Sequence, residues 1–138
     1  MAHFTRPQKV LFKHCDPAGI VFYPRFFEMI NDTVESFFDE ILGWPFEAIH
    51  PEAAVPTAAF NVAFKAPCRH GDQLDFTLTV QAIGRSSLSL RIEAVANRET
   101  RLQADQTLVH TGSTGRPAAW PSNIRKQIEA LLAGPEGS

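Results

Sequence analysis

The chain reads HCDPAGIVFYP from residue 14 to residue 24, and this stretch decides the fold. Residues 8–14 alternate in the manner of a β-strand, and Asp16 to Gly19 form a turn cluster. Pro24 is a favourable first residue of a helix, because the N–H that proline lacks would be unpaired there. The stretch is therefore predicted to lead from a strand, through a loop that carries Asp16, to a helix N-terminus.

This position would let the Asp16 carboxylate take part in attack on a carbonyl group. The first N–H groups of a helix have no partner and can stabilise an oxyanion while a carboxylate attacks or activates water. If the extended geometry continues, Val10, Phe12, His14 and Asp16 share one side of the strand and Cys15 points the opposite way. A Cys15–His14 nucleophile pair is therefore disfavoured, and Cys15 is interpreted as a small buried apolar residue.

The composition is typical of one soluble globular domain. The chain has 138 residues, 44% hydrophobic and 20% charged, with a formal net charge of −2. This charge gives no electrostatic drive toward nucleic acid or an anionic membrane. Cys15 and Cys68 lack the spacing of a disulfide framework or a metal site and suit a reducing compartment. With no signal-peptide or membrane-spanning pattern, we expect one cytoplasmic domain over residues 1–138, with a disordered tail at 134–138.

Two helices are predicted. The first runs from about Pro24 to Leu42, and its apolar face is formed by Phe27, Ile30, Val34, Phe37 or Phe38, and Ile41. Another face carries Glu28, Asp32, Glu35 and Asp39, which we interpret as a solvated surface. Residues 121–133 show helical spacing and are expected to form a short C-terminal helix.

The rest of the chain alternates with a period of two residues. Strands are indicated at 57–64, around 76–82, around 87–92 and at 102–110, with turns at 67–72, 84–86 and 97–100. The proline-rich segment 45–56 is expected to be a loop with one short helical turn. Phe46 and His50 of this segment, with the preceding Trp44, are interpreted as packing over the core rather than lining a pocket. One strand, a long helix and then several strands indicate an α+β fold.

The string Asp16-Pro17-Ala18-Gly19-Ile20-Val21-Phe22-Tyr23-Pro24 resembles the active-site signature of the 4-hydroxybenzoyl-CoA thioesterase family. Weaker similarity continues to about residue 112 and includes Asn61 and Phe64 after Pro56, the turn at 71–74 and residues 84–87. The resemblance implies a hotdog fold, in which a curved antiparallel sheet wraps around the long central helix.

The resemblance also implies acyl-CoA hydrolysis without a metal or a cofactor other than the substrate's own coenzyme A. Asp16 matches the family's catalytic carboxylate, which acts as nucleophile or general base, and the Tyr23 backbone N–H is expected to polarise the thioester carbonyl. The other residues expected to contact the substrate are His14, Gly19, Val21, Phe22 and Asn61. The residues expected at the coenzyme A phosphates are Arg85, Ser86 and Ser87, with Arg69 and His70 as further basic groups.

The family forms dimers with interfacial active sites, often paired into tetramers, so a homo-oligomer is expected here, and a homotetramer is the specific expectation. Phe22, Tyr23 and Trp44 suit an aromatic or short- to medium-chain acyl group, such as 4-hydroxybenzoyl. A carrier-protein thioester is an alternative substrate. A non-hydrolytic small-molecule or acyl-carrier binding protein, an isomerase and a hydratase are alternative functions, and a glutamate on the acidic helix face is an alternative catalyst.

Overall fold

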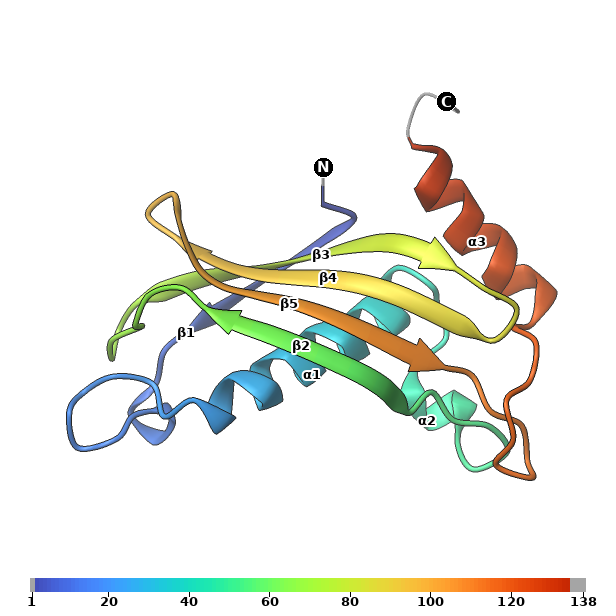
Figure 1. Ribbon diagram of the computed structural model, residues 1–138, viewed down its shortest axis with the longest axis horizontal. Coiled ribbons are helices and arrows are strands. Elements are labelled where there is room, and N and C mark those ends of the chain that lie inside the picture. The colour runs from blue at the N-terminus through green and yellow to red at the C-terminus, as the bar shows by residue number, and fades with distance from the viewer. Residues whose placement is uncertain (1, 135–138) are drawn as a thin grey trace.

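A computed structural model of the chain describes residues 2–134. A curved five-stranded antiparallel sheet wraps around one long helix, and a shorter helix lies at one end of the sheet (Figure 1). This is the arrangement of the hotdog fold, so the predicted fold class is confirmed. Gly134 follows the last helix, and the rest of the predicted disordered tail lies outside the described residues.

The element bounds are β1 (Phe4–Lys9), α1 (Pro24–Glu40), α2 (Phe46–Ile49), β2 (Thr57–Phe64), β3 (Gln73–Ile83), β4 (Ser87–Ala96), β5 (Glu99–Val109) and α3 (Ser122–Ala133). The strand order is β1-β3-β4-β5-β2. Strands β3, β4 and β5 form a meander, and β1 and β2 are the two edges. None of the helices described is long and apolar enough to cross a membrane.

Helix α1 presents its apolar face to the inner face of the sheet. The buried positions of the helix are Phe26, Met29, Ile30, Thr33, Val34, Phe37 and Phe38. The sequence placed Phe27 and Ile41 on this face, but both side chains are 37% exposed. The buried stripe of the helix runs through residues 26, 30, 34, 37 and 38. Phe27 and Ile41 lie at the margins of this stripe, where side chains reach solvent.

The first strand was wrongly predicted at residues 8–14. Strand β1 ends at Lys9, and residues 12–14 form a 3₁₀ turn. The His14 ring closes this turn, because its Nδ1 accepts the N–H of Leu11 at 2.9 Å. The predicted shared face is wrong as well: Phe12 is 81% exposed, whereas Val10 and His14 are buried.

The later strands follow the predicted alternation except at bulges. A bulge in β3 between Val80 and Ala82 leaves Ala82 exposed rather than on the apolar side. Between β4 and β5, Asn97 and Arg98 both have positive φ, of 50° and 64°. A two-residue hairpin of this kind matches the twist of the flanking strands.

The segment before β2 packs as the sequence predicted. Trp44 and Phe46 both lie against Phe38, with ring centroids 6.3 and 5.5 Å from it. Trp44 also contacts His110 and Trp120, so the segment is fixed to the end of β5 and to the chain that leads into α3. His50 remains exposed.

Candidate active site

Asp16 begins a tight turn at the N-terminal end of α1. The Gly19 N–H donates to the Asp16 carbonyl at 2.9 Å, and the Ala18 N–H donates to Asp16 Oδ1 at 2.9 Å. Aspartate, proline and glycine at the first, second and fourth positions favour such a turn. The side-chain bond fixes the carboxylate. Among the residues described, Oδ2 accepts no hydrogen bond, and Asp16 is half-buried.

Gly19 has a φ of +81°, a conformation that residues with a Cβ rarely adopt. It reverses the chain so that Ile20 and Val21 run back beside a second segment. Ile20 pairs with Arg69, the Val21 N–H donates to the Cys68 carbonyl at 2.8 Å, and the His70 N–H donates to the Gly19 carbonyl at 3.2 Å. The Asp16 loop is therefore held along one side by residues 68–70.

The start of α1 leaves a backbone donor at Tyr23. The N–H groups of Phe22, Arg25 and Phe26 all donate within the protein, to His14, Phe22 and Tyr23 carbonyls. Pro24 has no N–H. Within residues 2–134, the Tyr23 N–H has no hydrogen-bond acceptor. It is thus a free donor at the positive end of the helix dipole, which favours a developing negative charge.

A hollow of about 250 Å³ opens beside this helix start. Its walls are formed by Val21, Tyr23, Phe26, Phe64 and residues 65–68. The hollow is open to solvent, and its volume exceeds that of an enclosed cavity of about 150 Å³ that holds benzene in another protein. It is lined mostly by apolar side chains and lies next to the loop that carries Asp16.

Exposed aromatic rings extend from the hollow along the edge of the sheet. Phe64 contacts Tyr23 and Phe26, with ring centroids 6.0 and 5.8 Å apart, and Phe27 packs on Phe60 at 5.4 Å. Phe64 is 48% exposed and Tyr23 59% exposed. Phe22 contacts Tyr23 and is itself half exposed. These rings form a continuous apolar surface over α1 and β2.

His14 is a buried residue of the 3₁₀ turn that precedes the Asp16 loop. Its carbonyl accepts the Phe22 N–H at 2.9 Å, and its ring accepts the Leu11 N–H through Nδ1. The neutral ring therefore carries its proton on Nε2. Burial, together with the charge of Lys13, lowers the pKa of His14 below its ordinary value of 6.5. The ring lines a small hollow with Lys13, Arg25 and Glu28.

Replacing His14 with glutamine is expected to remove part of the pH dependence of stability. In the wild type, the His14 imidazole is protonated at a higher pH in the unfolded chain than in the folded protein, where its pKa is lowered. The free energy of unfolding should therefore fall from about pH 7 through 6.5 toward the lower folded pKa. Urea denaturation between pH 7.5 and 5 measures this slope. Equal slopes in the wild type and H14Q would show that His14 does not titrate in this way.

Two groups of predicted site residues lie away from Asp16. Asn61 stands opposite Asp105 on the sheet face that α1 does not cover, because its neighbour Phe60 is the residue that packs on the helix. Arg85, Ser86 and Ser87 form the β3–β4 hairpin at the other end of the sheet (Figure 1). The hairpin follows the end of β3, whereas the start of β3 at Gln73 pairs with Lys9, the last residue of β1. The ten residue steps along β3 between these two ends span roughly 33 Å. Arg85 is exposed there.

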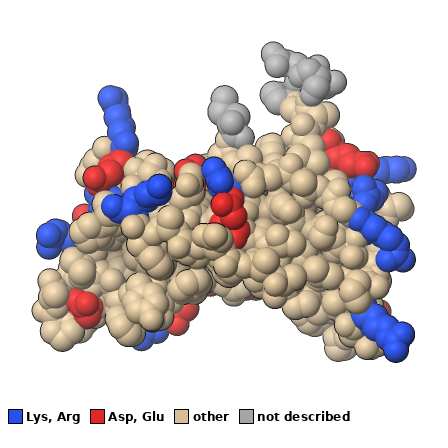
Figure 2. Space-filling model, viewed as in Figure 1, with Lys and Arg blue, Asp and Glu red and all other residues tan. Residues whose placement is uncertain are grey.

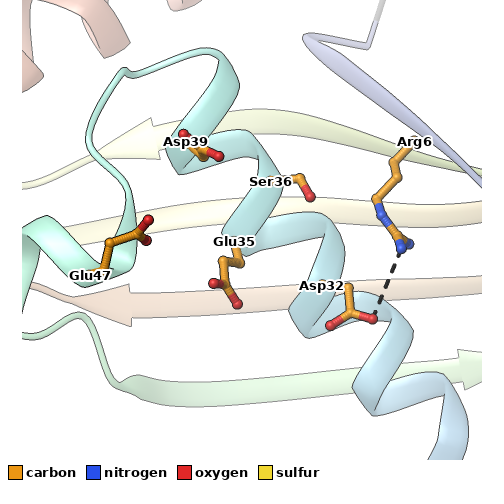
Figure 3. Close-up of a pocket in the computed structure, with 6 residues that line it drawn as sticks. All are labelled: Arg6, Asp32, Glu35, Ser36, Asp39 and Glu47. Carbon is orange, nitrogen blue, oxygen red and sulfur yellow. Dashed lines mark ion pairs between the residues drawn. The ribbon is translucent and has the colours of Figure 1, made fainter.

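The acidic face of α1 forms a separate open hollow. Figure 3 shows Asp32, Glu35 and Asp39 on successive turns, with Glu47 opposite and Arg6 within 4.0 Å of Asp32. Glu28, earlier on the helix, pairs with Arg25 at 3.0 Å. All four helix carboxylates are exposed, in agreement with a solvated face. No set of three metal-ligating side chains is brought together anywhere in the described part of the chain.

Sequence reasoning missed a buried charge behind the loop. Arg101 in β5 is 9% exposed and pairs with Asp72 at 2.9 Å. The sequence carried no local signal for this burial, because strict alternation with the buried Leu102 would place Arg101 on the solvent side. Cys15 is half-buried rather than fully buried, and its thiol lies 3.6 Å from the Leu11 carbonyl. Burial raises the pKa of the Cys68 thiol.

Comparison with known proteins supports this description. The sequence profile of the thioesterase-like superfamily matches residues 10–128. No curated protein sequence matches the chain. Similar solved structures include a 1,4-dihydroxy-2-naphthoyl-CoA thioesterase from Synechocystis, with a TM-score of 0.85, 22% identity and coverage of 94% of this chain and 97% of that one.

Two further solved structures are similar over most of their length. A gentisyl-coenzyme A thioesterase has a TM-score of 0.81 and 24% identity, covering 88% of this chain and 99% of that one. The dynemicin thioesterase has a TM-score of 0.84 and 15% identity, covering 93% and 96%. At these identities the structural likeness establishes the fold.

Proposed function

Because the chain belongs to the thioesterase-like superfamily and is thus a thioester hydrolase, we propose that it hydrolyses an acyl-CoA with Asp16 as the catalytic carboxylate. The observation that carries this proposal is the juxtaposition at the start of α1. A fixed carboxylate with one unbonded oxygen, a free Tyr23 N–H and an apolar hollow occur within one loop and the first helical turn.

The chemistry assigned to these groups takes one of two forms. In the nucleophilic form, Asp16 Oδ2 attacks the carbonyl carbon, the C–S bond breaks and coenzyme A leaves as its thiolate, which takes up the proton released when water is consumed in the next step. Water then cleaves the mixed anhydride to the acid and restores the carboxylate. In the general-base form, Asp16 removes a proton from water as the water oxygen attacks the carbonyl carbon. The C–S bond then breaks, the acid forms, and the proton passes from Asp16 to the departing coenzyme A thiolate. In both forms the oxyanion accepts a hydrogen bond from the Tyr23 N–H.

The assignment of the Tyr23 N–H is tested by exchanging Tyr23 for proline. Tyr23 has a φ of −53°, which proline can adopt, so Y23P removes the donor while keeping φ at this position. The loss of one oxyanion donor lowers kcat by about 10²- to 10³-fold. Y23A keeps the N–H and serves as the control. If kcat falls equally in both variants, the side chain rather than the N–H is responsible.

An aromatic acyl group is the proposed substrate class, with short- and medium-chain groups as weaker substrates. The hollow is walled by Tyr23, Phe26 and Phe64, whose rings favour edge-to-face contact with another ring. Two of the structurally similar enzymes are described as acting on naphthoyl-CoA and gentisyl-CoA thioesters, both aromatic. We include the 4-hydroxybenzoyl group in this class.

We further propose that a second copy of the chain covers the free edge of β2. Strand β2 has no charged residue. Figure 2 shows few charged side chains over the part of the surface where β2 runs in Figure 1. The opposite edge strand, β1, carries Arg6, Pro7 and Lys9. Charge and proline protect an edge from pairing, whereas an apolar edge is a template for it. A two-fold β2–β2 contact would place the hollow beside the subunit interface.

This pairing would also explain the predicted role of Arg85, Ser86 and Ser87. Thr57 at the start of β2 is level with the β3–β4 hairpin, whereas Phe64 at its end is next to the hollow. Antiparallel pairing of two β2 strands places the start of one against the end of the other. The exposed Arg85 of a second copy would then lie at the same end as Asp16 and could contact the coenzyme A phosphates.

Product analysis tests the proposed activity. The protein is incubated with benzoyl-CoA, and benzoic acid and free coenzyme A are quantified by mass spectrometry. Hydrolysis predicts equal amounts of both products. Binding of benzoyl-CoA without any product would support the alternative of a non-hydrolytic binding protein.

A further inference from the structure

We propose that Arg101 is a positioning residue for the Asp16 loop. Its buried guanidinium fixes the segment of residues 65–72, and that segment holds the loop by backbone hydrogen bonds. This inference rests on the proposed function, since the position of the loop affects turnover only if Asp16 acts on the substrate.

A β-bulge directs Arg101 inward. In the β4–β5 ladder Ala94 pairs with Leu102 and Val95 pairs with Thr100, so Arg101 is the extra residue of β5. Bulges re-aim a side chain relative to the regular alternation. The Arg101 side chain is only 10% exposed. A charged group is almost never buried to this extent unless it is paired.

The guanidinium group is paired with the segment behind the hollow. Arg101 Nη1 donates to the Pro67 carbonyl at 3.0 Å and to Asp72 Oδ2 at 2.9 Å. Its Nε lies 2.7 Å from the Glu99 carboxylate, as an ion pair. The Arg101 carbonyl accepts the N–H of Lys65 at 2.8 Å. Side chain and backbone of one residue thus bind both ends of residues 65–72.

The fixed segment then holds the loop that carries Asp16. Asp72 Oδ2 also accepts the Arg69 N–H at 2.9 Å, which shapes the turn between them. From that turn, the Cys68 carbonyl accepts the Val21 N–H and the His70 N–H donates to the Gly19 carbonyl. Arg101 therefore acts on the loop indirectly. Its own hydrogen bonds fix Pro67 and Asp72, and the backbone hydrogen bonds of Cys68 and His70 then hold the loop.

A comparison with Arg91 separates this role from a general contribution to stability. Arg91 pairs with Asp105 through two bonds of 3.0 and 3.1 Å, also between neighbouring strands. Both partners are partly exposed on the sheet face that α1 does not cover, and neither is hydrogen-bonded to residues 65–72. Arg91→Gln therefore removes a similar ion pair without disturbing the loop and serves as the matched control.

The kinetic test compares Arg101→Gln, Asp72→Asn and Arg91→Gln with the wild type on benzoyl-CoA. The inference predicts that kcat falls at least tenfold in R101Q and D72N, while the Kd for free coenzyme A changes less than threefold. R91Q should stay within twofold in both quantities. Asp72→Asn keeps the size of the side chain and provides the answer if R101Q does not fold. Wild-type kcat in folded R101Q and D72N would overturn the inference.

A second readout does not depend on activity. Hydrogen exchange of the Val21 and His70 amides reports the bonds between the segment and the loop. We expect these amides to exchange at least tenfold faster in R101Q or D72N, with the Val34 amide in α1 unchanged. If the wild type releases no coenzyme A, the proposed function fails, and exchange still decides whether Arg101 fixes the loop. Unchanged exchange at Val21 and His70 would overturn the inference.

Discussion

Replacing Asp16 with asparagine should lower kcat for acyl-CoA hydrolysis by about 10²- to 10⁴-fold, the usual contribution of a positioned acid or base. The amide oxygen of asparagine can still accept the Ala18 N–H, so the turn is expected to keep its shape. The variant loses the negative charge and the ability to attack or to accept a proton. Steady-state kinetics on benzoyl-CoA measure the change.

Binding and a second carboxylate provide the controls for this variant. The Kd for coenzyme A should change little in D16N, because the lost group acts on the carbonyl and not on the nucleotide. Asp105→Asn removes an exposed carboxylate on the other face of the sheet and should leave kcat within twofold. Turnover in D16N within a few-fold of the wild type would assign Asp16 to the turn alone.

A charged edge on β2 should convert the assembled protein to monomers. The variant Phe60→Lys with Phe64→Lys places two positive charges on an edge that otherwise carries none. Across a two-fold axis the two lysines of one copy lie against the β2 strand of the other copy, which carries the same two charges, and the aromatic contacts with Phe27 and Tyr23 are lost. Truncation of an aromatic residue at the centre of an interface commonly costs about 2 kcal/mol or more of binding energy. Light scattering after gel filtration measures the mass.

The single variant Phe60→Lys, which leaves the hollow residue Phe64 in place, should lose activity with the assembly. If the second copy completes the site, kcat/KM should fall by about 10²-fold, the loss that misplaced groups produce. Thr5→Lys adds charge to the β1 edge and is the control for general effects of charge. A wild-type protein that is monomeric and active would contradict the proposed interface.

The sequence was sufficient for the elements whose patterns are local. Helix α1 starts at Pro24 as predicted, because proline and the apolar spacing mark the same residue. The turn at Asp16 follows from its own residue types. Strand β1 was misplaced because residues 10–14 alternate like a strand, yet the His14 ring caps a 3₁₀ turn there. The hydrogen bond from the Leu11 N–H to the His14 ring favours the turn over the strand that the alternation of apolar and polar residues indicates.

The contacts around the loop depend on residues far apart in the sequence. Arg101 reaches Asp72 only because a bulge in β5 turns it inward, and alternation alone would have placed it in solvent. Asn61 was expected near the substrate, but its register with Asp105 puts it on the other face. Side-chain direction in a sheet reverses with a one-residue shift, so register had to come from the structure.

The rate of thiol release from a series of acyl-CoAs tests the central claim most directly. The series runs from acetyl-CoA to a long-chain acyl-CoA and includes benzoyl-CoA and 4-hydroxybenzoyl-CoA. We expect release of coenzyme A, with the highest kcat/KM for the aromatic thioesters, because Tyr23, Phe26 and Phe64 wall the hollow. No thiol release from any member of the series would contradict acyl-CoA hydrolysis as the function of this protein.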